Sequence, residues 1–120
     1  MDDKKTILLI EDDQMLLRLL VKSFKNVGFI VLTADNGKDG IEVASKKQPD
    51  IIVLDIILPQ VDGVTVYKAL QAAKAPIVVW TNLAQKEVEA AIGEPGIDYL
   101  AKAECSLERL VTHIQEIVEK

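Results

Sequence analysis

Residues 49–55, Pro-Asp-Ile-Ile-Val-Leu-Asp, form the stretch that decides the fold. The aliphatic run that ends at residue 54 is rich in β-branched residues, a pattern typical of a short strand buried on both faces of a parallel sheet. Asp55 follows at the point where this strand leaves the core. Ligands of open α/β sheets bind outside the carboxyl ends of the strands. A single Asp in that position is more often a loop cap, so its role depends on which polar residues lie beside it.

Similar apolar runs predict four further strands, at residues 6–10, 29–33, 76–80 and 97–101. Apolar residues at helical spacing predict helices near residues 14–27, 38–47, 64–73, 85–92 and 107–118, with a turn at residues 59–63. Five β–α repeats with short connections predict an α/β fold in which helices cover both faces of a parallel sheet. We therefore expect one domain over residues 1–120, without a linker or a second domain.

Composition excludes several classes of protein. Nearly half of the 120 residues are hydrophobic, yet no apolar run approaches the roughly 18 residues of a membrane span. The first five residues lack the apolar core of a secretory signal. Cys105 is the only cysteine, which fits a reducing cytoplasm. The net charge of −5 offers no basic surface for nucleic acid, so we expect a cytoplasmic protein that binds neither DNA nor a membrane.

Polar residues stand at four of the predicted strand ends. Glu11 and Asp12 follow the first strand, Asp55 the third, Thr81 the fourth and Lys102 the fifth. Clustered carboxylates repel one another, and a divalent cation with oxygen ligands would relieve that repulsion. A carboxylate nucleophile, a metal ion and a lysine together indicate phosphoryl transfer to Asp. The predicted site therefore combines Mg²⁺ with an aspartyl phosphate.

Five segments in this order carry a family resemblance. They are residues 7–13, residues 55–59, the pair Asp62-Gly63, the strand end at Thr81, and residues 98–102. Each segment is weak evidence alone, but all five at these separations are highly specific. The chain resembles a response-regulator receiver domain, the acceptor half of two-component signalling, of the single-domain chemotaxis-regulator-like type. The resemblance runs from Thr6 to about Val118 and implies a doubly wound, flavodoxin-like (βα)5 fold with strand order 2-1-3-4-5.

The resemblance also assigns roles at the site. It implies that Asp55 is the phosphoacceptor, that Asp12 is a direct Mg²⁺ ligand, and that Glu11 is a ligand through water. The Ile57 backbone carbonyl would complete the protein's share of the metal shell. An alternative alignment of the three successive acids pairs Asp12 with Asp13. We prefer Glu11 with Asp12, because the first strand and helix then align and Asp13 is left to cap the helix.

The remaining implied roles concern phosphoryl binding and signalling. Thr81 and Lys102 would contact the phosphoryl group, and Tyr99 stands at the family's aromatic switch position, beside Thr81. The resemblance implies a sensor histidine kinase or histidine phosphotransfer protein as donor and another protein as downstream target. It also implies a monomer or a weak phosphorylation-dependent dimer that is not a turnover enzyme.

Several residues depart from the family pattern or have ordinary explanations. Ala103 replaces the usual cis-proline after Lys102, so we expect a trans peptide there. Asn82 replaces a small residue. We interpret His113 as a solvated surface residue and Trp80 as core packing. Gly63 we interpret as a residue needed for backbone freedom in a turn.

Three other functions compete with the phosphoacceptor hypothesis. A phospho-independent, receiver-like interaction module is the main alternative, favoured by Ala103 and Asn82. An aspartyl-phosphate phosphatase of the haloacid-dehalogenase type would need a second Asp where Ile57 stands. A flavin-binding protein of the flavodoxin type would need a Ser/Thr/Gly-rich phosphate loop after the first strand, and Glu11 begins that loop instead.

Overall fold

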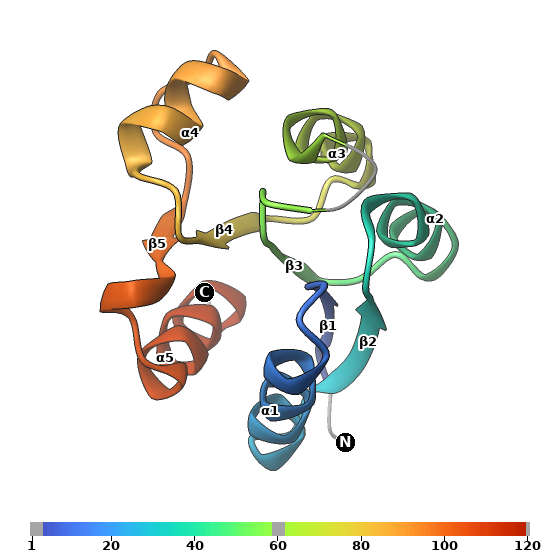
Figure 1. The fold of residues 1–120 in the computed structure, drawn as a ribbon. Helices are drawn as coiled ribbons and strands as arrows, with labels where there is room; N and C mark the ends of the chain where they lie inside the picture. Colours follow the sequence, from blue (N-terminus) through green and yellow to red (C-terminus); the bar gives the residue numbers. More distant parts are fainter. Residues whose placement is uncertain (1–3, 59–61, 120) are drawn as a thin grey trace.

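Five parallel strands form one sheet in the order β2-β1-β3-β4-β5, which confirms the predicted topology. The computed structural model describes residues 4–58 and 62–119. Figure 1 shows the twisted sheet at the centre of the molecule, with β3 between β1 and β4. The strands are β1 (Thr6–Ile10), β2 (Ile30–Ala34), β3 (Ile51–Leu54), β4 (Ile77–Thr81) and β5 (Tyr99–Ala101).

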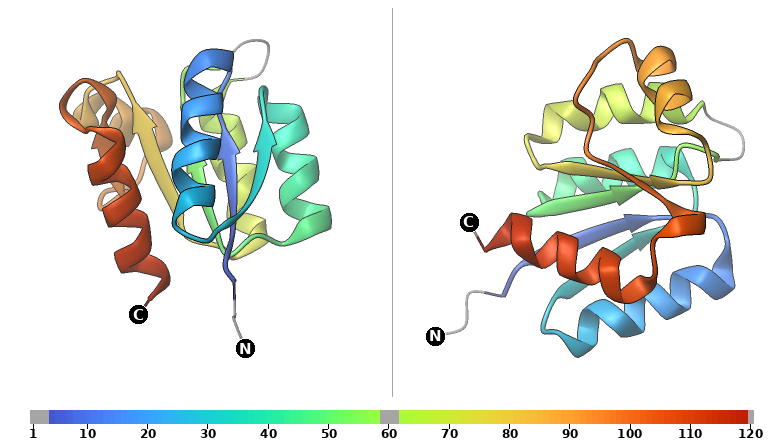
Figure 2. Two further views of the ribbon diagram at one scale, coloured as in Figure 1. Left: turned by 90° about the horizontal axis from the view of Figure 1, so that it is seen from below. Right: turned by 90° about the vertical axis from the view of Figure 1, so that its left-hand side faces the viewer.

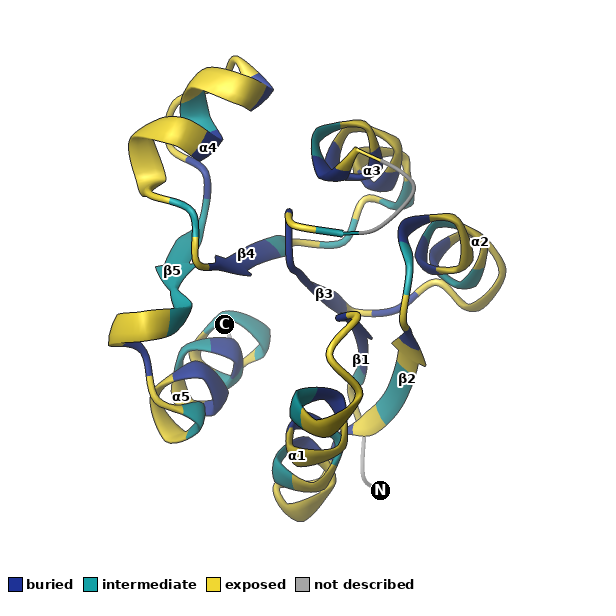
Figure 3. Cartoon of the chain, viewed as in Figure 1, coloured by how far each residue is buried: buried dark blue, intermediate teal, exposed yellow. Residues whose placement is uncertain are grey.

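Helices cover both faces of the sheet. They are α1 (Gln14–Asn26), α2 (Gly37–Lys47), α3 (Gly63–Leu70), α4 (Gln85–Ile92) and α5 (Leu107–Val118), with 3-10 turns at Gln71–Ala73 and Lys102–Glu104. Helices α1 and α5 lie on one face, and α2, α3 and α4 lie on the other, as Figures 1 and 2 show. Their inward sides are buried and their outward sides exposed (Figure 3). No described helix combines the length and the hydrophobicity needed to cross a bilayer.

Alternation along the strands divides the core between the two faces. Ile7 and Leu9 of β1 pack with α1 and α5, whereas Leu8 and Ile10 pack with the helices of the opposite face. Successive side chains of a strand point to opposite sides, so a fully apolar strand supplies both halves of the core. Every residue of β3 is buried, as its sequence predicted.

The predicted element boundaries differ from the observed ones by a few residues. Strand β5 has three residues rather than five, and the predicted helix at 64–73 becomes α3 followed by a 3-10 turn. Strand β4 includes Thr81, which makes this hydroxyl part of the sheet edge. Residues 59–61, the greater part of the predicted turn at 59–63, lie outside the described residues.

Gly63 has a different structural role from the one that we expected. Its φ is not among the positive values of the described glycines, which occur at Gly28, Gly93 and Gly96. A Cβ atom at Gly63 would instead overlap the backbone carbonyl oxygen of Ile56. The interpretation as a residue needed for backbone freedom was therefore wrong, since glycine is required here because two backbone segments approach closely.

Candidate functional site at the carboxyl edge of the sheet

The ends of four strands place polar side chains at one edge of the sheet. Glu11 follows β1, Asp55 follows β3, Thr81 ends β4 and Lys102 follows β5. The Asp55 backbone N–H donates to the Ile10 carbonyl over 3.2 Å, which ties the start of the Asp55 loop to the end of β1. Parallel strands end at a common edge, so residues far apart in sequence meet there.

Lys102 joins two buried carboxylates at the centre of this edge. Its Nζ lies 2.6 Å from Glu11 Oε1 and 2.6 Å from Asp55 Oδ2. The Lys102 side chain is 13% exposed, and those of Glu11 and Asp55 only 3% and 6%. Ion pairs of this kind are screened little by salt. Loss of one partner would leave a buried charge uncompensated.

Burial opposes the charges of Glu11 and Lys102, and their pairing outweighs burial only for the lysine. Desolvation raises the pKa of the Glu11 carboxyl above its usual value, although the hydrogen bonds from Lys102 and from the Asp13 N–H lower it. Desolvation lowers the pKa of the Lys102 ammonium, but its bonds to Asp55 and Glu11 raise it more, so the net shift is upward. Lys102 therefore carries its positive charge at neutral pH.

The second oxygen of Asp55 is also held. Its Oδ1 accepts a hydrogen bond of 2.9 Å from the backbone N–H of Ile57. This contact of a side chain with the backbone two residues later forms a turn immediately after β3. Both carboxylate oxygens of Asp55 thus have a defined direction, one toward Lys102 and one toward the loop.

Asp12 adds a third, exposed carboxylate. One oxygen from each of Glu11, Asp12 and Asp55 lies within 4.8 Å of the other two. Carboxylates this close repel one another, and together they could hold a divalent cation that prefers oxygen ligands. Asp13 is used differently, because its Oδ1 accepts the Leu16 N–H over 3.1 Å and caps α1. This geometry favours the pairing of Glu11 with Asp12.

Thr81 and Tyr99 both contact the loop between β4 and α4. The Thr81 side chain is fully buried, and its Oγ1 accepts a long hydrogen bond of 3.4 Å from the Leu83 N–H. The Tyr99 hydroxyl donates to the Leu83 carbonyl. Burial raises the pKa of Tyr99, and the negative charges of Glu104 and Glu87 raise it further, so the phenol remains a donor at neutral pH.

Comparison with known proteins identifies the family. Residues 7–115 match the family model described as the response regulator receiver domain. The chain belongs to this family. A two-component response regulator from Clostridium difficile has the same fold, with a TM-score of 0.87, 27% identity, and coverage of 98% of both chains.

Curated relatives contain the receiver domain as part of a longer chain. The alkaline phosphatase synthesis transcriptional regulatory protein PhoP of Bacillus subtilis is 35% identical over 102 residues, which is 82% of this chain and 42% of that protein. A protein-glutamate methylesterase/protein-glutamine glutaminase of Archaeoglobus fulgidus is 33% identical over 118 residues, 93% of this chain and 34% of that protein. This receiver domain thus spans less than half of either relative.

Sequence reasoning missed two contacts of this receiver domain. Trp80 is buried as expected, but its ring also lies under Lys102, with Nζ 5.2 Å from the ring centroid. The interpretation of His113 as a solvated residue was wrong, because its Nε2 lies 2.7 Å from Asp98 Oδ1 and the side chain is half-buried. Neither contact could be expected before β5 was placed beside β4 and under α5. The peptide between Lys102 and Ala103 is trans, as expected.

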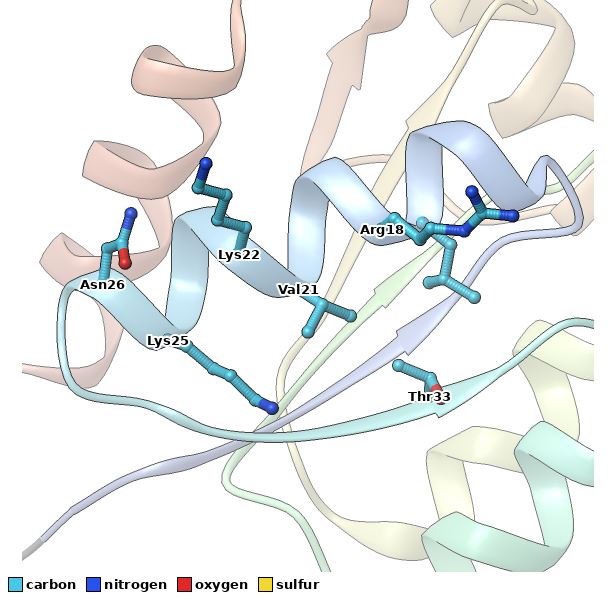
Figure 4. A pocket seen from close by; sticks show the side chains of 7 residues that line it. Arg18, Val21, Lys22, Lys25, Asn26 and Thr33 are labelled. Carbon is cyan, nitrogen blue, oxygen red and sulfur yellow. The ribbon is translucent and has the colours of Figure 1, made fainter.

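A separate hollow lies on the flank of α1. Its volume is about 490 Å³, and in Figure 4 Val21 and Lys25 point from α1 toward β2, while Thr33 points back from β2. Among the residues that the structure describes, no acidic side chain or thiol lines it, so this hollow does not extend the acidic site. The lining residues are Leu17, Arg18, Val21, Lys22, Lys25, Asn26 and Thr33.

Proposed function

We propose that this receiver domain accepts a phosphoryl group on Asp55 from a sensor histidine kinase or a histidine phosphotransfer protein. The observation that carries the proposal is the buried Asp55 carboxylate, which shares Lys102 with Glu11 and clusters with Asp12. A cluster of three acids and one lysine retains excess negative charge. That excess suits a divalent cation and a transferring phosphoryl group.

The carboxylates would hold Mg²⁺, with Asp12 and Asp55 as direct ligands and Glu11 acting through water. The Ile57 carbonyl would be the remaining protein ligand, in the loop that the Ile57 N–H already ties to Asp55. The ion would neutralise charge on the phosphoryl oxygens. Glu11 cannot pair fully with the metal and with Lys102 at once, so its indirect role is consistent with the 2.6 Å contact to Lys102.

Asp55 would act as the nucleophile. One of its carboxylate oxygens forms a bond to phosphorus as the bond from phosphorus to the donor histidine nitrogen breaks, and the electron pair leaves on that nitrogen. Lys102 then exchanges part of its contact with Asp55 for the phosphoryl oxygens, where its charge is most useful. Thr81, at the end of the neighbouring strand, donates its hydroxyl to a phosphoryl oxygen.

The signal would leave the site through Thr81 and Tyr99. Turning Thr81 Oγ1 toward the phosphoryl group costs only the long contact with the Leu83 N–H. The Tyr99 hydroxyl holds the carbonyl of the same residue, so the two side chains compete for the position of one loop. Movement of that loop changes the surface formed by α4 and β5, which a downstream protein would bind.

The outer face of α1 suits the kinase contact. Met15 is 72% exposed and Leu19 is 49% exposed, one turn apart on the helix that begins beside Asp12. Exposed apolar residues next to an acidic site favour a protein partner over a small substrate. We propose a cytoplasmic, monomeric or weakly dimerising signalling protein that is not a turnover enzyme, and the buried free thiol of Cys105 fits that reducing compartment.

A small-molecule donor tests the proposal directly. The protein incubated with acetyl phosphate or phosphoramidate and Mg²⁺ should gain the mass of one phosphoryl group, measured by intact-mass spectrometry. Chelation of the metal with EDTA should prevent the gain. A chain that gains no mass from either donor at saturating Mg²⁺ would contradict the proposed function.

One observation favours the alternative of a phospho-independent interaction module. The Tyr99 hydroxyl already bonds the Leu83 carbonyl while Asp55 is unmodified. A partner could therefore find part of the α4 and β5 surface already in place. The same mass measurement separates the two functions, since a module of this kind needs no phosphoryl group for binding.

Replacement of Asp12 by Asn should slow phosphorylation about tenfold or more, because the change removes a direct metal ligand. The fold should remain intact or gain stability, since the exposed Asp12 charge repels Glu11 and Asp55. The measurement is the initial rate of mass gain at a fixed Mg²⁺ concentration. Asp13→Asn is the matched control, because Asn caps a helix as well as Asp does. A slow Asp13→Asn variant beside a normal Asp12→Asn variant would show that the alternative pair of acids holds the metal.

Replacement of Thr81 by Ala should uncouple phosphorylation from the surface change while Asp55 remains reactive. The hydroxyl that would join the phosphoryl group to the loop at Leu83 is absent in this variant. Amide NMR spectra with and without beryllofluoride, a phosphoryl mimic, should show large shifts near Tyr99 in the wild type and in the surface control Thr65→Ala. Equally large shifts in Thr81→Ala would show that the switch does not depend on Thr81. The coupling at stake is about 1–3 kcal/mol.

A further inference from the structure

We propose that Trp80 is a positioning residue, whose indole ring holds the Lys102 ammonium between Asp55 and Glu11. The Lys102 Nζ lies 5.2 Å from the ring centroid, within the range of a cation–π interaction. The same nitrogen lies 2.6 Å from each of the two carboxylates. The ammonium thus has two anions and one aromatic face around it. The catalytic part of this inference rests on the proposed function.

Strand geometry explains why the ring reaches this lysine. In the pairing of β4 with β5, Trp80 lies opposite Leu100. Lys102 follows β5 directly and opens the 3-10 turn at the end of that strand. The pairing of β4 with β5 thus brings Trp80 beside the strand end from which the lysine side chain extends.

The ring is itself held in place. Trp80 is 4% exposed and belongs to the core cluster between the sheet and α5, with Cys105, Leu110 and Ile114 as members of the same cluster. Core side chains packed in this way have little freedom to turn. A fixed ring can direct a mobile partner, whereas a mobile ring could not.

Lys102 needs such support. It opens a 3-10 turn directly after a strand of three residues, and the next residue, Ala103, is exposed. A lysine side chain has a flexible stem of four carbons, and it loses considerable conformational entropy when its ammonium is confined. A flat aromatic surface beneath the ammonium reduces the number of positions that the side chain can take before a phosphoryl group arrives.

The presence of tryptophan rather than an aliphatic residue at this core position also needs an explanation. Trp80 Nε1 is buried, and its one candidate partner among the described residues is the Cys105 thiol, a weak acceptor that gives it no hydrogen bond of normal geometry. Burial of a poorly paired N–H is unfavourable, and an aliphatic residue would fill the strand without that penalty. The contact between the ring face and Lys102 supplies a function that an aliphatic side chain cannot.

Two substitutions of Trp80 separate the aromatic face from simple packing. Trp80→Met keeps an apolar side chain without a π face, and Trp80→Phe keeps a face without the N–H. We expect the rate of phosphorylation by phosphoramidate at saturating Mg²⁺ to fall about three- to tenfold in Trp80→Met and less than about twofold in Trp80→Phe. Equal loss in both variants would overturn the proposal.

A double-mutant cycle tests whether Trp80 acts through Lys102. In a Lys102→Ala background, Trp80→Met should cause no further loss of rate, because the group that it positions is gone. A purely structural role would lower the rate by the same factor in both backgrounds, and that outcome would overturn the proposal.

An NMR measurement without any phosphoryl donor keeps the inference independent of the proposed function. The Lys102 side-chain protons next to Nζ should show upfield ring-current shifts in the wild type and in Trp80→Phe, and these shifts should vanish in Trp80→Met. Unshifted Lys102 signals in the wild-type protein would overturn the positioning role. Failure of the wild type to gain a phosphoryl group would instead contradict the proposed function. The ring-current shifts would still show whether Trp80 holds the Lys102 ammonium.

Discussion

Replacement of Asp55 by Asn should abolish the gain of a phosphoryl group from a small-molecule donor. The amide cannot act as the nucleophile, and Asp55 is the one carboxylate of the cluster held by both Lys102 and the Ile57 N–H. Folding should survive, because the Asn oxygen can still accept a hydrogen bond from Lys102. The measurement is intact-mass spectrometry after incubation with phosphoramidate and Mg²⁺.

Asp62→Asn provides the matched control for this experiment. Asp62 lies close in sequence, and its Oδ1 caps α3 by accepting the Val64 N–H over 3.1 Å. Asn preserves such a cap, so this variant should be phosphorylated at the wild-type rate. Persistent labelling of Asp55→Asn, with the phosphoryl group mapped by peptide analysis to another residue, would refute the assignment of Asp55.

Replacement of Gly63 by Ala should cause the largest loss of stability among the variants considered. The new Cβ would overlap the Ile56 carbonyl oxygen, and backbone cannot move aside as a flexible side chain can. We expect the free energy of unfolding to fall by about 3 kcal/mol or more, the upper part of the range for overpacking. Urea denaturation followed by circular dichroism measures this change.

Gly40→Ala is the control for the glycine experiment. At that position a new Cβ would meet the Ile10 side chain rather than backbone, at 2.5 Å from Cδ1 and 2.9 Å from Cγ1, and alanine favours the helical conformation of α2. A side chain can shift more readily than backbone, so the loss should be smaller than at Gly63. If both variants lose the same free energy, the close approach of Gly63 to Ile56 is not what makes glycine necessary there.

The Gly63 result also bears on function, because Ile56 follows Asp55 directly. Displacement of the Ile56 carbonyl would move the loop that carries the Ile57 N–H, one of the two hydrogen bonds to Asp55. Any folded Gly63→Ala protein should thus be phosphorylated more slowly than its folded fraction alone would explain. The rate per folded molecule, from mass gain and circular dichroism on the same sample, measures this effect.

The sequence by itself indicated the architecture and which polar residues would gather at one edge of the sheet. A strand buried on both faces needs apolar residues throughout, so short aliphatic runs in the sequence predict such strands. The acids, the hydroxyl and the lysine that end these runs mark where the strands leave the core. Parallel strands joined by helices must end at a common edge, so Glu11, Asp55, Thr81 and Lys102 could be expected to meet. The cover of helices on both faces was confirmed, and so was the strand order, which the family resemblance had implied.

Only the tertiary structure decided which of these residues touch and what supports them. Lys102 pairs with two carboxylates located 91 and 47 residues away, and Trp80 lies under it because β5 pairs beside β4. Glycine is required at position 63 because the chain folds back onto the Ile56 carbonyl, and His113 contacts Asp98 because α5 packs on the sheet. Contacts of this kind depend on register, loop path and side-chain direction together. Local sequence patterns carry the period of an element but not the distance between two elements.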